Sequence, residues 1–206
     1  MKALVLSLAL AFTGIAHAQH GGAAPAAATV PAEAAQFDFL VGQWGLEVAP
    51  KVSGLAAMIH GAPKLVGSWK AWKAFDGYGL DDELRIFDAS GNPMSLNYSQ
   101  RIFDAKTKRW LVSGLDVYRA RFGSSGGVWQ DGEMRLEGSG QNSEGKPMLT
   151  RTRFTEITPD RFKMRQDRSY DNGASWEEGT LTVVAKRVAV EAPRPRGTLA
   201  GPPRGR

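Results

Sequence analysis

The densest acidic cluster in the sequence is Asp81-Asp82-Glu83, and Arg85 follows two positions later. Side chains alternate between the two faces of a β-strand, so these three carboxylates cannot converge on one ion. Glu83 and Arg85 share one face. Pointing inward, they could hold a ligand's polar end or adjust a glutamate for proton transfer. Pointing outward, they form a solvated pair, which is the interpretation we favour. The candidate catalytic residues are Glu83, Asp82 and Arg85.

A second set of polar side chains follows an apolar pair along one strand. Phe162 and Met164 alternate with charged residues and are expected to face inward, which puts Gln166 and Arg168 near one mouth of the fold. A buried arginine needs an acidic partner, either an incoming carboxylate or an acid on a neighbouring strand. Trp69 on one further strand, and Tyr98 and Gln100 on another, are added as candidates. The predicted ligand-binding residues are Trp69, Tyr98, Gln100, Met164, Gln166 and Arg168.

Trp69 and Trp72 are three positions apart, so on a strand they face opposite ways. One of them is expected in the core, and the other at a mouth or on an exposed sugar-binding surface. Tyr98 and Gln100 are spaced by two from Leu96 and Ile102, so all four share one face, which the apolar pair predicts to be the inner one.

The segment from Ser169 to Trp176 fits the pattern of an Asp box, which is a hairpin turn. Asp171 can accept backbone N–H bonds, Gly173 takes the strained backbone angle, and Trp176 packs beneath. We interpret this segment as structural. The alternative is a calcium loop, because Asp167, Ser169, Asp171 and Glu178 have EF-hand-like spacing, although position six is not glycine.

Other reactive groups are scarce. The chain has no cysteine, and His60 is the one histidine within the predicted domain, too few for a closed metal site or a triad. The sequence has no phosphate-binding glycine loop, nucleophile elbow or zinc spacing. We therefore expect no metal and no cofactor.

The chain divides into four parts. Residues 1–18 read as a cleaved signal peptide, which predicts a periplasmic or secreted protein beginning near Gln19. Residues 19–35 form an Ala/Pro/Gly-rich linker, 36–190 the folded domain, and 191–206 a disordered basic tail. The net charge of +5 is carried by Lys2 and four tail arginines, so the domain is neutral and no nucleic-acid partner is expected.

Short alternating segments separated by turn residues predict an all-β fold. The turns are marked by Gly, Asn and Pro, as at Asp131-Gly132 and Thr158-Pro159-Asp160. About ten antiparallel strands in a meander should close into a barrel. Helical turns are expected only at 37–41 and 54–60, the second as a lid. The strands are predicted at 43–49, 64–75, 82–87, 94–103, 109–118, 127–130, 133–139, 148–157, 161–169 and 176–187.

Three motifs resemble the bacterial "domain of unknown function 1579" family and its calycin-like relatives. They are the opening segment 37–44 ending at Trp44, the segment 101–104 beginning at Arg101 and followed by Trp110, and the closing segment 153–176 with Ser169, Asp171, Gly173 and Trp176. The resemblance implies a lipocalin-like β-barrel and no established activity. Met164 and Asn172 depart from the family pattern. The histidine that haem-binding relatives use near the end of the domain has no counterpart here.

Three functional hypotheses follow. The leading one is a barrel that binds a small apolar or amphipathic molecule, with an anionic group as an option. The second is an enzyme that uses Glu83 or Asp82 as a base, with Arg85 or Arg168 orienting the substrate. The third is an envelope protein that interacts through exposed aromatic side chains and its basic tail.

Overall fold

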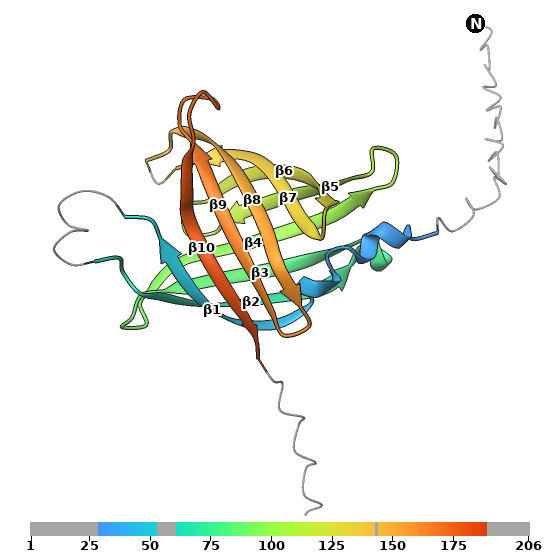
Figure 1. Cartoon of the computed structure of the whole chain (residues 1–206), viewed down its shortest axis with the longest axis horizontal. Coiled ribbons are helices and arrows are strands. Elements are labelled where there is room, and N and C mark those ends of the chain that lie inside the picture. The colour runs from blue at the N-terminus through green and yellow to red at the C-terminus, as the bar shows by residue number, and fades with distance from the viewer. Residues whose placement is uncertain (1–28, 53–60, 143, 189–206) are drawn as a thin grey trace, which may run out of the picture.

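The computed structural model describes residues 29–52, 61–142 and 144–188. Ten antiparallel strands close into one barrel, in which β1 pairs with both β2 and β10 (Figure 1). The predicted all-β meander barrel is therefore confirmed. The strands are β1 (Gly42–Pro50), β2 (Leu65–Ala74), β3 (Gly79–Phe87), β4 (Pro93–Asp104), β5 (Arg109–Asp116), β6 (Arg121–Gln130), β7 (Glu133–Gln141), β8 (Pro147–Thr158), β9 (Arg161–Ser169) and β10 (Glu177–Arg187).

All ten predicted strands are present, and the largest difference is at β6, which begins at Arg121 instead of 127. The segment 123–127, Gly-Ser-Ser-Gly-Gly, has the composition of a turn but pairs along its length with β5 and β7. A side chain at Gly127 would place its Cβ 1.9 Å from the backbone oxygen of Arg135. Glycine is needed here because it allows β6 and β7 to approach closely.

Short 3₁₀ helices precede the first strand and close one end of the barrel. These are η1 (Ala32–Ala35) and η2 (Asp38–Leu40), and a third, η3 (Phe75–Gly77), lies between β2 and β3. The helical turn expected at 37–41 is confirmed by η2. Ala34 is buried in the core, so the last residues of the predicted linker pack against the barrel. The turn expected at 54–60, with His60, lies outside the described residues.

The helices η1 and η2 together form a plug at this end of the barrel. Trp44 and Arg187 attach the plug to the barrel wall. The indole Nε1 of Trp44 donates to the backbone oxygen of Leu40 at 2.8 Å. The Arg187 guanidinium lies 4.1 Å from the Trp44 ring centroid, and its Nη1 donates to the backbone oxygen of Val41 at 2.9 Å. The first and last strands therefore hold the plug together.

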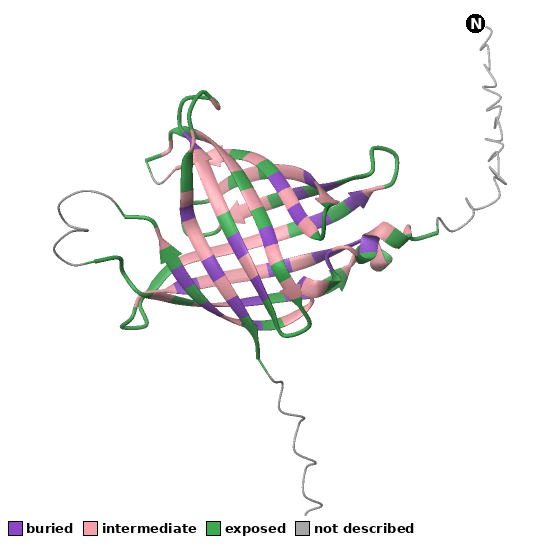
Figure 2. Cartoon of the chain, viewed as in Figure 1, coloured by how far each residue is buried: buried purple, intermediate pink, exposed green. Residues whose placement is uncertain are grey.

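Most of the core lies at the plugged end, and buried positions alternate with more exposed ones along the strands (Figure 2). Its centre is aromatic: the Phe162 ring lies 4.8 Å from Trp44, 5.5 Å from Phe39 and 6.0 Å from Phe154. The Phe37 ring meets Trp110 edge-on at 4.8 Å. These contacts fill the barrel cross-section at this end.

No helix among the described residues has the length and apolar character that a membrane crossing requires.

Candidate functional site

The opposite half of the barrel interior is a cavity of about 570 Å³. It opens at the end where β3, β5, β7 and β9 finish and their hairpins turn back. Side chains from nine of the ten strands line it, all but β1. A volume of this size is within the range of pockets that hold small molecules.

The floor of the cavity is a buried ion pair. Asp82, 1% exposed, accepts from Nε of Arg101 at 2.5 Å and from the indole Nε1 of Trp69 at 2.8 Å. Arg101, 5% exposed, lies 5.0 Å above the Phe37 ring. Apolar side chains surround the pair and complete the floor: Val112, Leu136, Phe154 and Met164. Both carboxylate oxygens of Asp82 are therefore occupied by donors from the protein.

Small polar residues make the walls above the floor. Hydroxyls and an amide face the interior from β4, β6 and β8, at Asn97, Ser99, Ser125, Thr150 and Thr152. Glycines keep the space open: a Cβ at Gly114 would come no closer than 3.8 Å to its nearest neighbour, Ser99 Oγ, and one at Gly140 would have nothing within 4 Å. Since glycine weakens a strand interior, its use at these positions preserves volume at some cost in stability.

Arg168 is the charged side chain on β9 closest to the mouth. Its Nε donates to Oε1 of Gln166 at 2.9 Å, and Gln166 in turn donates to Thr152 Oγ1 at 3.3 Å. Among the described residues, Arg168 has no ion pair. The expected placement of Gln166 and Arg168 on the inner face near one mouth is confirmed. The alternative that an acid on a neighbouring strand neutralises Arg168 is not.

The rest of the mouth is basic and partly aromatic. Arg119 pairs with Asp116 at 3.0 Å, and Arg121 donates to the backbone oxygen of Asn142. Together the described residues that line the cavity include four arginines and two aspartates, a formal excess of two positive charges. Because the cavity walls exclude much of the solvent, this excess favours an anionic guest.

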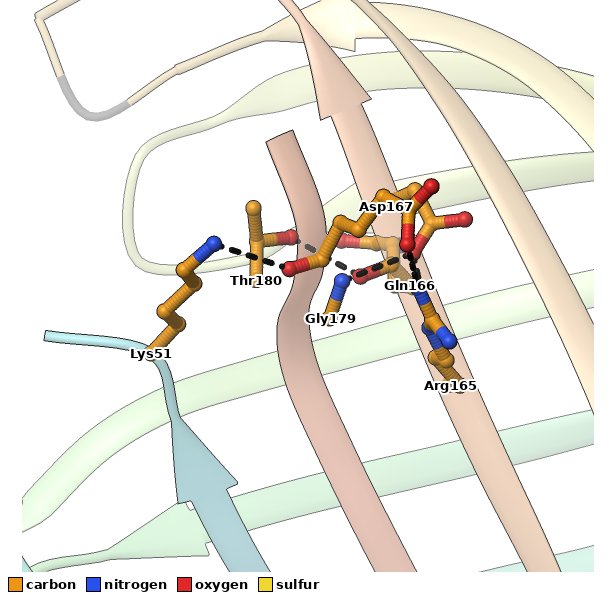
Figure 3. A network of polar contacts seen from close by, with 7 residues as sticks. Lys51, Arg165, Gln166, Asp167, Gly179 and Thr180 are labelled. Carbon is orange, nitrogen blue, oxygen red and sulfur yellow. Dashed lines mark hydrogen bonds and ion pairs between the residues drawn. The ribbon is translucent and has the colours of Figure 1, made fainter. Parts of the chain in front are cut away.

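A bulge in β10 fixes the wall behind Gln166 (Figure 3). The pairing of β10 with β9 shifts between Glu177 and Leu181, and Gly179 adopts a positive φ of 64°. The backbone N–H of Gly179 donates to Asp167 Oδ1 at 2.7 Å, and the Thr180 hydroxyl donates to the backbone oxygen of Gln166 at 3.0 Å. These bonds hold β9 from outside, so the Gln166 and Arg168 side chains project into the cavity from a fixed backbone.

The turn after β9 has the geometry expected of an Asp box. Asp171 accepts from the backbone N–H of Ser175 at 2.9 Å and from the hydroxyls of Ser175 and Ser169, while Ser169 Oγ accepts from Gly173 N–H at 2.8 Å. These bonds, with those from Ser175 first, lower the pKa of Asp171 to about 2. Trp176 stacks under the Arg151 guanidinium at 3.9 Å. Among the residues of the calcium alternative, Asp167, Ser169 and Asp171 accept hydrogen bonds within the turn and the bulge, and Glu178 pairs with Arg165 at 2.8 Å.

Glu83 and Arg85 lie on the outer face and form a pair at 2.7 Å, as favoured from the sequence. Their hydrogen bond is the main reason that the pKa of Glu83 is lowered. A base working near neutral pH needs the opposite shift, so this geometry argues against Glu83 in proton transfer. Asp82, in contrast, reaches the cavity.

Tyr98 and Gln100 do not face the cavity, contrary to expectation. Both are on the outer face of β4, where the Tyr98 hydroxyl donates to Asp81 Oδ2 at 2.7 Å. This bond is the main cause of a Tyr98 pKa raised to about 12. Gln100 lines a shallow outer groove of about 900 Å³ that also includes Ile102 and Trp176. The inner face of β4 carries Ser95, Asn97, Ser99, Arg101 and Phe103 instead.

Trp69 and Trp72 face opposite ways, as the spacing predicts. Trp69 is buried at the cavity floor, and Trp72 is 43% exposed beside Tyr98. Arg101 was expected from the sequence only as part of a structural motif, and its place in the cavity was missed. The signal for it lies in Asp82, which shares a strand face with Leu84 and Ile86 and is therefore an inward carboxylate that needs a cation.

No family model matches the chain, so the resemblance to the "domain of unknown function 1579" family is not confirmed. No curated protein matches it either. Among solved structures, the S-type phycobiliprotein lyase CPES from Guillardia theta is 9% identical, covers 76% of this chain and 92% of its own, and has a TM-score of 0.51.

Two other barrels have lower scores. EF1p2_mFAP2b bound to DFHBI is 12% identical with a TM-score of 0.41, covering 75% of this chain and 98% of its own. The redesigned β-barrel mFAP0 bound to DFHBI is 11% identical with a TM-score of 0.37, covering 72% of this chain and 99% of its own. At these scores neither supports a conclusion about this chain. The chain is thus a closed ten-stranded antiparallel barrel that shares its fold with the Guillardia theta lyase.

Proposed function

We propose that the barrel binds a small anionic amphipathic molecule in its interior cavity. The apolar part of the ligand lies against Trp69, Phe154 and Met164, and the anionic group lies at Arg168 near the mouth. The observation that carries this proposal is Arg168 itself. It lines the cavity, is held through Nε by Gln166, and has no carboxylate partner among the described residues.

A guanidinium held at one edge presents its other N–H groups for a second partner, and carboxylates, sulfates and phosphates match that geometry. The excess of arginine over aspartate in the lining favours the same class of ligand. We also propose that the protein is exported after cleavage near Ala18. The support for export is the signal-peptide pattern of residues 1–18.

The test is a titration with dansyl-labelled undecanoate, exciting tryptophan and reading dansyl emission. Trp69 lines the cavity, so a bound dansyl group accepts energy from it. We expect saturable one-to-one binding, and about a tenfold loss of affinity in Arg168→Gln, the size of one charge-assisted hydrogen bond. Added salt should weaken binding less in the variant than in the natural protein.

Arg153→Gln is the matched control, because Arg153 is an exposed arginine on the outer face of the neighbouring strand β8. It should bind the probe as the natural protein does. The absence of saturable binding in the natural protein would refute the proposal. Equal affinity in Arg168→Gln would remove Arg168 from the site.

A further inference from the structure

The floor pair has an unused edge. The Arg101 side chain donates to Asp82 through Nε, and Asp82 is the one hydrogen-bond partner of this side chain among the described residues. A guanidinium carries five N–H groups, and one carboxylate accepts at most two of them along a shared edge. Asp82 Oδ1 accepts from Trp69, and Asp82 Oδ2 accepts from Nε of Arg101, so this carboxylate holds the guanidinium through one of its five N–H groups.

Arg101 borders the cavity, and its remaining side-chain N–H groups have no hydrogen-bond partner among the described residues. Arg101 is one of the lining residues, although its side chain is 6% exposed. Among the described residues, the side-chain N or O atom that is fully buried without a partner is Asp81 Oδ1, on the outer face of β3. The terminal nitrogens of Arg101 are therefore not sealed in the core, and the space they reach is the cavity floor.

The charge of the floor selects the kind of acceptor. Asp82 neutralises Arg101, so a second anion brought to the floor would be desolvated beside a pair with no net charge. A carbonyl oxygen satisfies N–H donors without bringing a charge and loses far less hydration on burial. The mouth, with Arg168, has the opposite preference.

We propose that the ligand has two polar groups, an inference that rests on the proposed function. A neutral carbonyl group, such as an ester, amide or ketone, enters the barrel and binds Arg101 at the floor. The anionic end of the ligand stays at Arg168 near the mouth. On β9, Met164 stands at the floor and Arg168 near the mouth. The four residue steps from Met164 to Arg168 span about 13 Å of strand. The two anchors thus favour an elongated molecule with polar groups at both ends and an apolar middle.

The experiment compares three probes of similar length by displacement of dansyl-labelled undecanoate: dodecanoate, dodecanedioate and its monomethyl ester. The readout is the affinity ratio of the monoester to dodecanoate. Comparing this ratio between proteins cancels the intrinsic difference in hydrophobicity. We expect the ratio to be about fivefold higher in the natural protein than in Arg101→Lys, the size of one hydrogen bond. Lysine keeps a charge beside Asp82 but lacks the second edge of the guanidinium.

Asp82→Asn tests the charge argument separately, and it also carries the test if Arg101→Lys fails to fold by circular dichroism. The amide keeps an acceptor for Trp69 but leaves the floor positive, so dodecanedioate should gain at least fivefold on the monoester. Arg153→Lys should change neither ratio. Unchanged ratios in both floor variants, with dodecanoate still bound, would overturn this inference and leave the proposed function standing. If no probe binds to any of the proteins, both fall.

Discussion

The two halves of the barrel are built from the same strands and have opposite interiors. On β9, Phe162 and Met164 pack into the plugged half, and Gln166 and Arg168 face the cavity of the open half. On β4, Phe103 is buried at the plugged end, while Ser99 and Asn97 line the cavity. The change from apolar to polar takes place within one strand, near the Asp82–Arg101 pair.

This division suggests that stability and binding are separated along the barrel axis. The plugged half contains the aromatic contacts that resist unfolding, and the open half exchanges packing for volume. Changes in the first half should therefore affect the free energy of unfolding, and changes in the second should affect ligand affinity.

The largest effect is expected from Phe162→Ala. The ring is fully buried and contacts Trp44, Phe39 and Phe154, so its removal leaves a cavity that the neighbours cannot fill. Urea denaturation should show a loss of about 3–5 kcal/mol in the free energy of unfolding. Met94 lies at the rim of the open half and is 48% exposed, so Met94→Ala should lower the free energy of unfolding by about 0.5 kcal/mol. Similar losses in the two variants would mean that the halves are not separate.

The next effect is expected from Gly114→Leu, which breaks the open half without touching the plugged one. The added Cβ meets no atom closer than 3.8 Å, so the side chain extends into the cavity. Affinity for dansyl-labelled undecanoate should fall by about tenfold or more, since ligand and side chain compete for one volume. Stability should stay within about 0.5–1 kcal/mol, because glycine is itself unfavourable in a strand.

Ser113→Leu is its control, since Ser113 lies one position along β5 on the outer groove. That variant should bind the probe normally. Loss of binding in both variants would point to a disturbed strand, and retention in both would place the ligand outside the barrel.

The smallest effect concerns the turn that follows β9 at the open end. The pKa of Asp171 is about 2, below its ordinary value of 3.8, so the ionised carboxylate favours the folded turn above pH 3.8. That contribution is lost as the pH falls from about 4 to about 2. Amide exchange at Ser175 and Gly173 should therefore accelerate over this range relative to β1, beyond the intrinsic pH dependence. In Asp171→Asn, the acid-dependent step at these amides should disappear.

The sequence predicts the plugged half better than the open half, and the reason is physical. Hydrophobic alternation locates inward residues only where the interior is apolar, as at Met134, Leu136 and Phe162. On β4 the inner face is polar because it lines a cavity, so Leu96 and Ile102 mark the outer face instead. Tyr98 and Gln100 were misplaced for this reason.

The same effect hid the floor pair and the start of β6. Asp82 and Arg101 are 19 positions apart, and only the pairing of β3 with β4 brings them together. The glycines and serines of β6 have turn composition because this wall must be thin and open, not because the chain turns there. A polar or small inner face next to a well-patterned apolar one is itself a sign of a cavity.

The contact between Arg187 and Trp44 also constrains the order in which the protein can be made. These residues are 143 positions apart, and β1 closes the barrel only by pairing with β10. A ribosome must therefore synthesise almost the entire domain before the plug can be clamped and Trp44 covered. Until then the aromatic core has an open edge, and the exposed apolar side chains of the growing chain are prone to aggregate. Closure of this barrel thus waits until β10 has been made.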